Sequence, residues 1–129
     1  MRILVISDIH ANLAAFEAVL EDADGKWDKM WFLGDLIGYG PDPNECVSLI
    51  QQFDHISLSG NHDWAVLAKL DASTFNPEAQ HAIRWTRETI TESTRDYLDS
   101  LPTTLVEGDF TLAHASPRQP VWEYILDQN

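Results

Sequence analysis

The sequence predicts an α/β fold in which a mixed, largely parallel sheet is flanked by helices. Two observations lead to this prediction. Strand-like and helix-like segments alternate along the first half of the chain, an order that favours a parallel sheet with right-handed crossovers. The first strand-like segment is rich in Ile, Leu and Val without alternation, as expected for a strand buried on both faces. With 129 residues, the chain has the length of one ordinary domain.

Residues 2–7 (RILVIS) form the first predicted strand. A helix follows, because Asn12 is a suitable N-terminal cap and apolar residues then recur at helical spacing as far as the Asp-Gly pair at 24–25. The short aromatic run at 30–33 predicts a second strand. It leads into a loop at 34–41 that contains three glycines.

Asp42, Pro43 and Glu45 have the identities of a cap, a first-turn proline and a capping-box acid. They predict a second helix that ends near residue 52. Residues 56–58 form a third predicted strand, which completes the alternation of strands and helices.

The second half of the chain is expected to be mostly helical. Helices are predicted over 64–70, 77–88 and about 93–101. Two short strands at 103–107 and 110–114 are expected to pair as a hairpin.

Charge and composition exclude several classes of function. A net charge of −13, from 21 acidic and 8 basic residues, disfavours binding to a bare nucleic-acid backbone, which depends on Lys and Arg. A phosphate ligand would therefore need a cation. The single cysteine, Cys46, cannot form an internal disulfide, and the first seven residues lack the pattern of a signal peptide. We expect a cytoplasmic protein, and no apolar run reaches the roughly 18 residues that suggest a membrane span.

Polar residues follow the predicted strands at their carboxyl ends, where ligand sites of open α/β sheets collect. If the chain stays extended after the first strand, Asp8 and His10 project to the same side and can reach one point. Carboxylate, imidazole and amide groups together suit Mn, Fe or Zn ions. One carboxylate, that of Asp35, could bridge two such ions about 3.5–4 Å apart.

The order of these polar residues resembles the calcineurin-like metallophosphoesterase superfamily. Four blocks carry the resemblance: Asp8-Ile9-His10, Gly34-Asp35, Gly60-Asn61-His62-Asp63 and His114. The loop at 34–41 is similar to the small prokaryotic phosphodiesterase branch that is often named after diadenosine tetraphosphatase. The resemblance implies that the fold is the amino-terminal part of a four-layer α-β-β-α sandwich.

The resemblance also implies a set of metal ligands. Asp8, His10 and Asp35 would hold one divalent transition-metal ion. Asp35, Asn61 and His114 would hold the other. Taken alone, each of these residues also has an ordinary structural explanation, such as a helix cap, a turn or a core histidine.

By the same resemblance, His62 is a candidate for contacting the scissile phosphate, together with Asn61, and for helping the leaving oxygen to depart. Relatives of the protein-phosphatase type carry an aspartate at the position of Gly38 that orients this histidine. Asp63 is then the nearest candidate to hold His62. Arg118 could bind a substrate phosphate or could be a solvated surface arginine.

One signature block of the family is not found after His114. The family normally ends with a Gly-His-x-His block that gives one more histidine to each ion. We therefore expect residues 1–129 to be a calcineurin-like phosphoesterase domain without its carboxyl-terminal part.

The function expected from these residues is metal-dependent hydrolysis of a phosphodiester or a nucleotide-type phosphate ester by a metal-bridging hydroxide. An alternative is a non-catalytic protein-interaction module on the same scaffold. A third possibility is that the 129-residue chain is inactive alone because it lacks the last histidines. The exposed face of an incomplete second sheet should also favour self-association.

Overall fold

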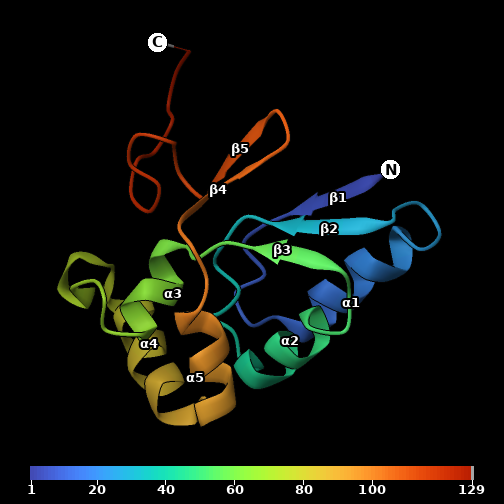
Figure 1. The fold of residues 1–129 in the computed structure, drawn as a ribbon. Helices are drawn as coiled ribbons and strands as arrows, with labels where there is room; N and C mark the ends of the chain where they lie inside the picture. Colours follow the sequence, from blue (N-terminus) through green and yellow to red (C-terminus); the bar gives the residue numbers. More distant parts are fainter. Residues whose placement is uncertain (129) are drawn as a thin grey trace.

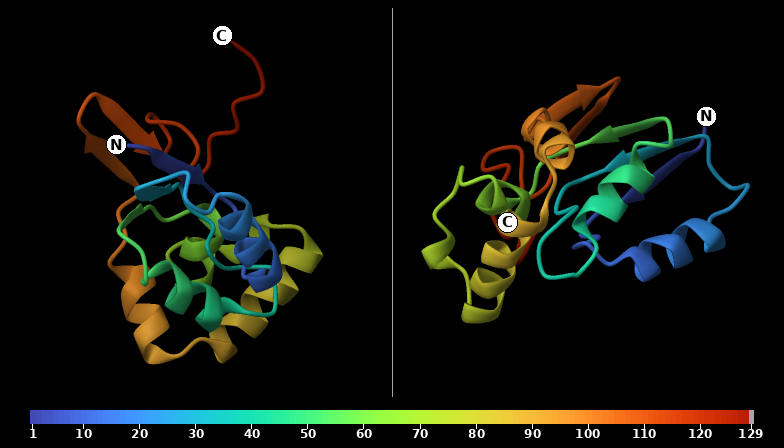
Figure 2. Two further views of the ribbon diagram at one scale, coloured as in Figure 1. Left: turned by 90° about the vertical axis from the view of Figure 1, so that its right-hand side faces the viewer. Right: turned by 90° about the horizontal axis from the view of Figure 1, so that it is seen from below.

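The structure is a computed structural model that describes residues 1–128. Its centre is a parallel sheet with the strand order β1-β2-β3. The strands alternate with two helices along the chain: β1 (Ile3–Ile6), α1 (Leu13–Asp22), β2 (Lys29–Phe32), α2 (Pro43–Ile50) and β3 (His55–Ser57). Both helices lie on one face of the sheet, next to each other (Figures 1 and 2). The predicted parallel arrangement is confirmed.

The first two helices begin where the cap signals predict. The side chain of Asn12 accepts a hydrogen bond of 3.0 Å from the amide of Ala15, which satisfies one of the free donors at the start of α1. Helix α2 has Asp42 in the cap position and Pro43 in its first turn, although the Asp42 side chain makes no capping hydrogen bond. The fixed backbone angle of proline is suited to this position.

The second half of the chain is helical and ends in a hairpin. Its elements are α3 (Asn61–Val66), the 3-10 turn η1 (Ala72–Thr74), α4 (Pro77–Thr89), α5 (Glu92–Asp99), β4 (Thr104–Glu107) and β5 (Phe110–Ala113). Strands β4 and β5 pair antiparallel, so the mixed α/β class is confirmed. The longest helix of the described chain, α4, has 13 residues. No helix within residues 1–128 combines the length and the apolar character needed to cross a membrane.

Helix α3 begins three residues earlier than predicted. The prediction placed its start at residue 64, whereas the helix starts at Asn61. The cause is a hydrogen bond of 2.9 Å from the amide of Gly60 to the carboxylate of Asp63, which closes the first helical turn. Asn61 and His62 therefore stand on a short helix and not on a loop.

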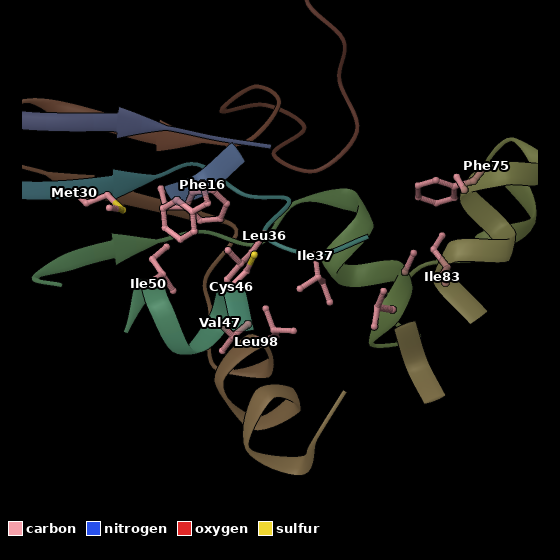
Figure 3. Close-up of a cluster of buried hydrophobic side chains, with 14 residues drawn as sticks. Phe16, Met30, Leu36, Ile37, Cys46, Val47, Ile50, Phe75, Ile83 and Leu98 are labelled. Carbon is pink, nitrogen blue, oxygen red and sulfur yellow. The ribbon is translucent and has the colours of Figure 1, made fainter. Parts of the chain in front are cut away.

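The apolar core lies mainly between the sheet and the helices. Phe16 from α1, Met30 from β2 and Ile50 from α2 meet below the sheet, whereas Phe75 and Ile83 lie at the helical end of the molecule (Figure 3). This packing fixes the strands from one side. The carboxyl ends of all three strands face the end of the molecule where α3 begins (Figure 1).

The opposite face of the sheet is open. Val5 of β1 is 53% exposed, so the prediction that the first strand is buried on both faces is wrong. The β4–β5 hairpin covers only part of this face, where Phe110 meets Trp31 at a ring distance of 5.4 Å. The hairpin itself leaves Val106 and Phe110 largely exposed.

Candidate metal centre

The loops after β1 and β2 run side by side. The amide of Asp8 donates to the carbonyl of Gly34 at 2.9 Å, and the amide of His10 donates to the carbonyl of Asp35 at 3.0 Å. These hydrogen bonds continue the pairing of β1 and β2 beyond the ends of the strands. They place the side chains of the first loop next to the carboxylate of the second.

The backbone of the two loops is left-handed at residues that are not glycine. The φ angles are 57° at Asp8, 50° at His10, 54° at Ala11 and 60° at Asp35. The chain is thus not extended here, and the expectation that Asp8 and His10 converge through an extended segment is wrong. Left-handed residues of this kind cost on the order of 1–3 kcal/mol each and concentrate at functional sites.

The side chains predicted as metal ligands lie together. Asp35 Oδ2 is 3.6 Å from His10 Nε2 and 3.4 Å from His114 Nε2. Asp8 Oδ1 is 3.5 Å from His10 Nε2, and Asn61 Oδ1 is 3.2 Å from His114 Nε2. The structure therefore brings all five residues to one place at the carboxyl end of the sheet.

The spacing of these atoms fits divalent ions. Most of the separations are longer than an ordinary hydrogen bond. Two ligand atoms that are each about 2.1 Å from a shared tetrahedral ion lie about 3.4 Å apart, which matches the 3.4 Å between Asp35 Oδ2 and His114 Nε2. Asp35 stands centrally between the two histidines, as a bridging carboxylate must.

Both histidines present the same ring nitrogen to the centre. His10 Nδ1 lies 3.3 Å from the carbonyl of Ile37, and His114 Nδ1 lies 2.9 Å from the carbonyl of Leu33. A backbone carbonyl on Nδ1 fixes the tautomer that leaves Nε2 free to bind a cation.

The carboxylates give the site a strong preference for positive charge. Burial lowers the pKa of His114, but the close and negatively charged carboxylate of Asp35 outweighs burial and raises it to about 9. Burial likewise lowers the pKa of His10, and Asp8 and Asp35 together raise it above its usual range. The contact with the imidazole of His10 lowers the pKa of Asp8. The two carboxylates thus favour positive charge on the imidazoles that face them.

His62 lies directly against this cluster. Its amide donates to Asp35 Oδ1 at 3.0 Å, and its side chain is part of a possible ligand group with His10 and Asp35. Only 7% of the residue is exposed, and this burial lowers the pKa of its imidazole. Within residues 1–128, the Nδ1 of His62 is buried without a hydrogen-bond partner.

Asp63 does not hold His62, and the expectation that it does is wrong. Its carboxylate accepts hydrogen bonds from the amides of Asp35 at 2.8 Å, Ile37 at 3.1 Å and Gly60 at 2.9 Å. Burial, followed by the charge of Asp35, raises the pKa of Asp63 to about 7. Both oxygens of this carboxylate accept main-chain amides, because Asp63 lies in the first turn of α3 and points back toward the loop after β2.

Arg118 stands apart from the cluster. Its side chain is 80% exposed and forms an ion pair with Glu123. Glu123 lines the cleft at the centre, whereas Arg118 is not among the lining residues. The structure thus favours the surface interpretation of Arg118 over a phosphate contact.

A cleft of about 430 Å³ opens over the cluster. Its walls consist of the predicted ligands and of the segment that follows β5, including Trp122 and Tyr124. The sequence prediction missed Tyr39, whose ring lies 5.2 Å from that of His10 and 4.8 Å from that of His62. An aromatic residue between two glycines of a loop was the signal that could have identified it.

The sequence and the fold both have clear relatives. A family model described as calcineurin-like phosphoesterase matches residues 1–128. Protein MJ0912 of Methanocaldococcus jannaschii is 44% identical over 96% of this chain and 54% of its own length. A symmetrical bis(5'-nucleosyl)-tetraphosphatase of Photorhabdus laumondii is 29% identical over 68% of this chain and 38% of its own length.

Among solved structures, a metallophosphoesterase from Sphaerobacter thermophilus is 52% identical and superimposes with a TM-score of 0.83. The match covers 97% of this chain and 51% of that protein. The chain therefore spans about half the length of this metallophosphoesterase and of protein MJ0912.

Proposed function

The chain belongs to the calcineurin-like phosphoesterase family, and on that basis we propose that the protein hydrolyses phosphodiesters or nucleotide-type phosphate esters with two divalent ions. The observation that carries the proposal is the position of Asp35. Its Oδ2 faces His10 at 3.6 Å and His114 at 3.4 Å, so one carboxylate serves two neighbouring ligand groups.

The residues divide between two ions. Asp8, His10 and Asp35 would hold the first, and Asp35, Asn61 and His114 the second. The mixture of nitrogen and oxygen ligands favours Mn, Fe or Zn over Ca or Mg. Bound divalent ions supply positive charge to the phosphate oxygens and acidify water for attack on phosphorus.

His62 supplies the proton for the leaving oxygen. It lies in the wall of the cleft with Asn61, where both side chains can contact the phosphate of a substrate. Burial lowers the pKa of His62, so the negative charge of the phosphate is needed to stabilise the imidazolium that donates the proton. A positioned proton donor typically contributes about 10²–10⁴-fold to the rate.

The cleft and the relatives support the proposed substrate class. A volume of about 430 Å³ lies within the roughly 300–1,000 Å³ range of small-molecule sites. Several relatives are named symmetrical bis(5'-nucleosyl)-tetraphosphatases, which supports a nucleotide-type substrate. With its net charge of −13, the protein should need its metal ions to attract such an anion.

We further propose a cytoplasmic location. The single cysteine, Cys46, is buried as a free thiol in the core. A chain without an internal disulfide is suited to a reducing compartment.

The decisive experiment measures hydrolysis of bis(4-nitrophenyl) phosphate and of 4-nitrophenyl phosphate with Mn²⁺ and with a chelator. We expect activity with Mn²⁺ only, and a higher rate with the diester. The Asp35→Asn variant should lose activity and bind fewer ions per chain. Equal rates with Mn²⁺ and with chelator, or an Asp35→Asn variant that hydrolyses the diester normally, would exclude the two-metal mechanism.

A further inference from the structure

We propose that Tyr39 and Phe75 are positioning residues that orient the imidazole of His62 by ring contacts, in place of a hydrogen bond to its Nδ1. This inference rests on the proposed function, in which His62 gives a proton to the leaving oxygen. It concerns two residues that belong to neither group of candidate ligands.

Aromatic rings surround the imidazole of His62 on several sides. The Tyr39 ring lies 4.8 Å away at an interplanar angle of 42°. The Phe75 ring lies 4.9 Å away at 75°, and the His10 ring lies 4.8 Å away at 79°. These distances and angles are those of favourable edge-to-face and tilted ring pairs.

The loop after β2 supplies no hydrogen-bonding side chain to Nδ1, because position 38 is a glycine. A Cβ atom built on Gly38 would lie 3.0 Å from both Cβ and Nδ1 of His62. The main chain at Gly38 therefore packs closely against this side of the imidazole. Because Nδ1 has no partner among the described residues, ring packing is the contact that can limit rotation of the imidazole.

Further contacts hold the rings of Tyr39 and Phe75 in place and join the two segments that carry them. The amide nitrogen of Asn76 donates to the hydroxyl of Tyr39 at 3.3 Å, and the carbonyl oxygen of the same side chain caps α4 through Ala79 at 2.8 Å. Asn76 directly follows Phe75. On its other side, Phe75 contacts the ring of Trp122 at 5.1 Å. The loop after β2 and the start of α4 are thus joined around His62.

The role predicts a dependence on the leaving group. Nitrophenolate leaves without a proton, whereas phenolate needs one in the transition state. If the rings hold His62 in place, their removal should slow the hydrolysis of methyl phenyl phosphate much more than that of methyl 4-nitrophenyl phosphate. A general packing defect would slow both reactions alike.

The experiment compares Tyr39→Leu and Phe75→Leu with Tyr39→Phe, which keeps the ring and removes only the hydroxyl, and with His62→Ala. With Mn²⁺, we expect each leucine variant to lose on the order of 10–100-fold in kcat for methyl phenyl phosphate, the scale expected for a misplaced catalytic group. KM and the rate with the nitrophenyl ester should change little. The Tyr39→Phe variant keeps the ring but loses the hydrogen bond from Asn76, so its loss should be smaller than that of either leucine variant.

A second measurement needs no activity. In the metal-free protein, the ring protons of His62 should shift and broaden in both leucine variants, because the neighbouring ring currents are lost and the imidazole samples more rotamers. The same signals should change less in the Tyr39→Phe variant, which keeps the ring.

The results separate the two proposals. A His62→Ala variant that keeps full activity on methyl phenyl phosphate would overturn the role of His62 as proton donor. If His62→Ala loses activity while both leucine variants keep the parent rate and the parent His62 signals, only the ring-positioning proposal is overturned.

Discussion

Asp35 is the residue on which the centre depends most. Its Oδ1 accepts a hydrogen bond from the amide of His62, and its Oδ2 faces His10 and His114. Only 2% of the residue is exposed. The main chain of Gly60 packs against this carboxylate so closely that position 60 has no room for a side chain.

Replacement of Gly60 by alanine should therefore disturb metal binding. The new Cβ would lie 2.1 Å from Asp35 Oδ1 and 2.6 Å from the Asp35 amide nitrogen, so the carboxylate must move. We expect Mn²⁺ affinity, measured by calorimetry, to fall at least about tenfold, and the free energy of unfolding to fall by roughly 1–3 kcal/mol as in other overpacked sites.

Gly25→Ala is the matched control for this prediction. Gly25 also has a left-handed backbone, with φ at 70°, but no atom lies within 4 Å of the place that an alanine Cβ would take. The control should lose about 1–2 kcal/mol of stability from backbone strain and keep its affinity for Mn²⁺. Parent-like Mn²⁺ binding by Gly60→Ala would show that Asp35 tolerates the displacement.

At the scale of elements, Asp63 joins the start of α3 to the loop after β2. One buried carboxylate accepts the amides of Gly60, Asp35 and Ile37. Each of these amides would otherwise be a buried donor without a partner. Asp63, which belongs to α3, therefore helps to hold the loop after β2 that carries Asp35.

Asp63→Asn should therefore weaken both stability and metal binding. The amide nitrogen of asparagine would face main-chain donors that the carboxylate now satisfies. We expect a loss of roughly 3 kcal/mol in the free energy of unfolding, measured in urea, since each unsatisfied donor costs about 1–3 kcal/mol. Mn²⁺ affinity should fall as well.

Asp71→Asn provides the comparison. Asp71 is an exposed carboxylate that accepts the amide of Ser73 at 2.9 Å at the start of η1. It should lose little stability and no metal affinity. A loss of the same size in both variants would refute the special role of Asp63.

The sequence was sufficient to predict the alternating elements but not how they meet. Apolar periodicity and cap residues such as Asn12 are local signals, and both helices between the strands begin where these signals place them. The start of α3 depends on the capping contact between the Gly60 amide and the Asp63 carboxylate, a local pattern that the prediction overlooked. The exposure of Val5 depends on whether other elements cover that face of the sheet. The sequence of an apolar strand is the same whether one face or both faces are covered.

The same distinction applies to the site. The resemblance to the metallophosphoesterase family implied that Asp8, His10, Asp35, Asn61 and His114 form one set of ligands, and the structure places these residues together. The ring contacts of His62 were not predictable as a set. Tyr39 stands out between two loop glycines, but nothing in the sequence connects it with Phe75, which lies far along the chain.

At the scale of the whole molecule, the acidic chain and its histidines make stability depend on pH and metal. The pKa of His114 rises from 6.5 to about 9 in the folded protein. A group whose pKa is higher in the folded state stabilises fully below its unfolded pKa, and this stabilisation is lost as the pH rises through the folded pKa.

The metal-free protein should accordingly lose stability between pH 6.5 and pH 9. The raised pKa of His10 acts in the same direction. Added Mn²⁺ should oppose the loss increasingly at higher pH, because an ion binds the neutral imidazole and displaces protons. Urea titrations with chelator and with Mn²⁺ at several pH values measure both effects. The His114→Gln variant should show a smaller pH dependence, and an unchanged slope would contradict this assignment.

The open face of the sheet predicts self-association of the 129-residue chain. On this side of the sheet Val5 is 53% exposed, and Phe110, which packs against Trp31, is 61% exposed. Exposed apolar side chains of this kind favour contacts between proteins. Sedimentation velocity should show a mass that increases with concentration. Phe110→Ser should reduce this increase, whereas Tyr39→Phe should not. A monomeric mass at all concentrations would show that the open face does not mediate self-association.

The left-handed backbone of the first loop also limits which sequences can build it. Ala11 cannot act as a metal ligand through its side chain, yet it is fully buried and has a φ of 54°. Branched side chains rarely adopt this conformation, and burial disfavours polar ones. A library randomised at residue 11 and selected for function should recover alanine and glycine almost alone, with glycine relieving the torsional cost. Selection at this position would act on chain geometry and not on chemistry.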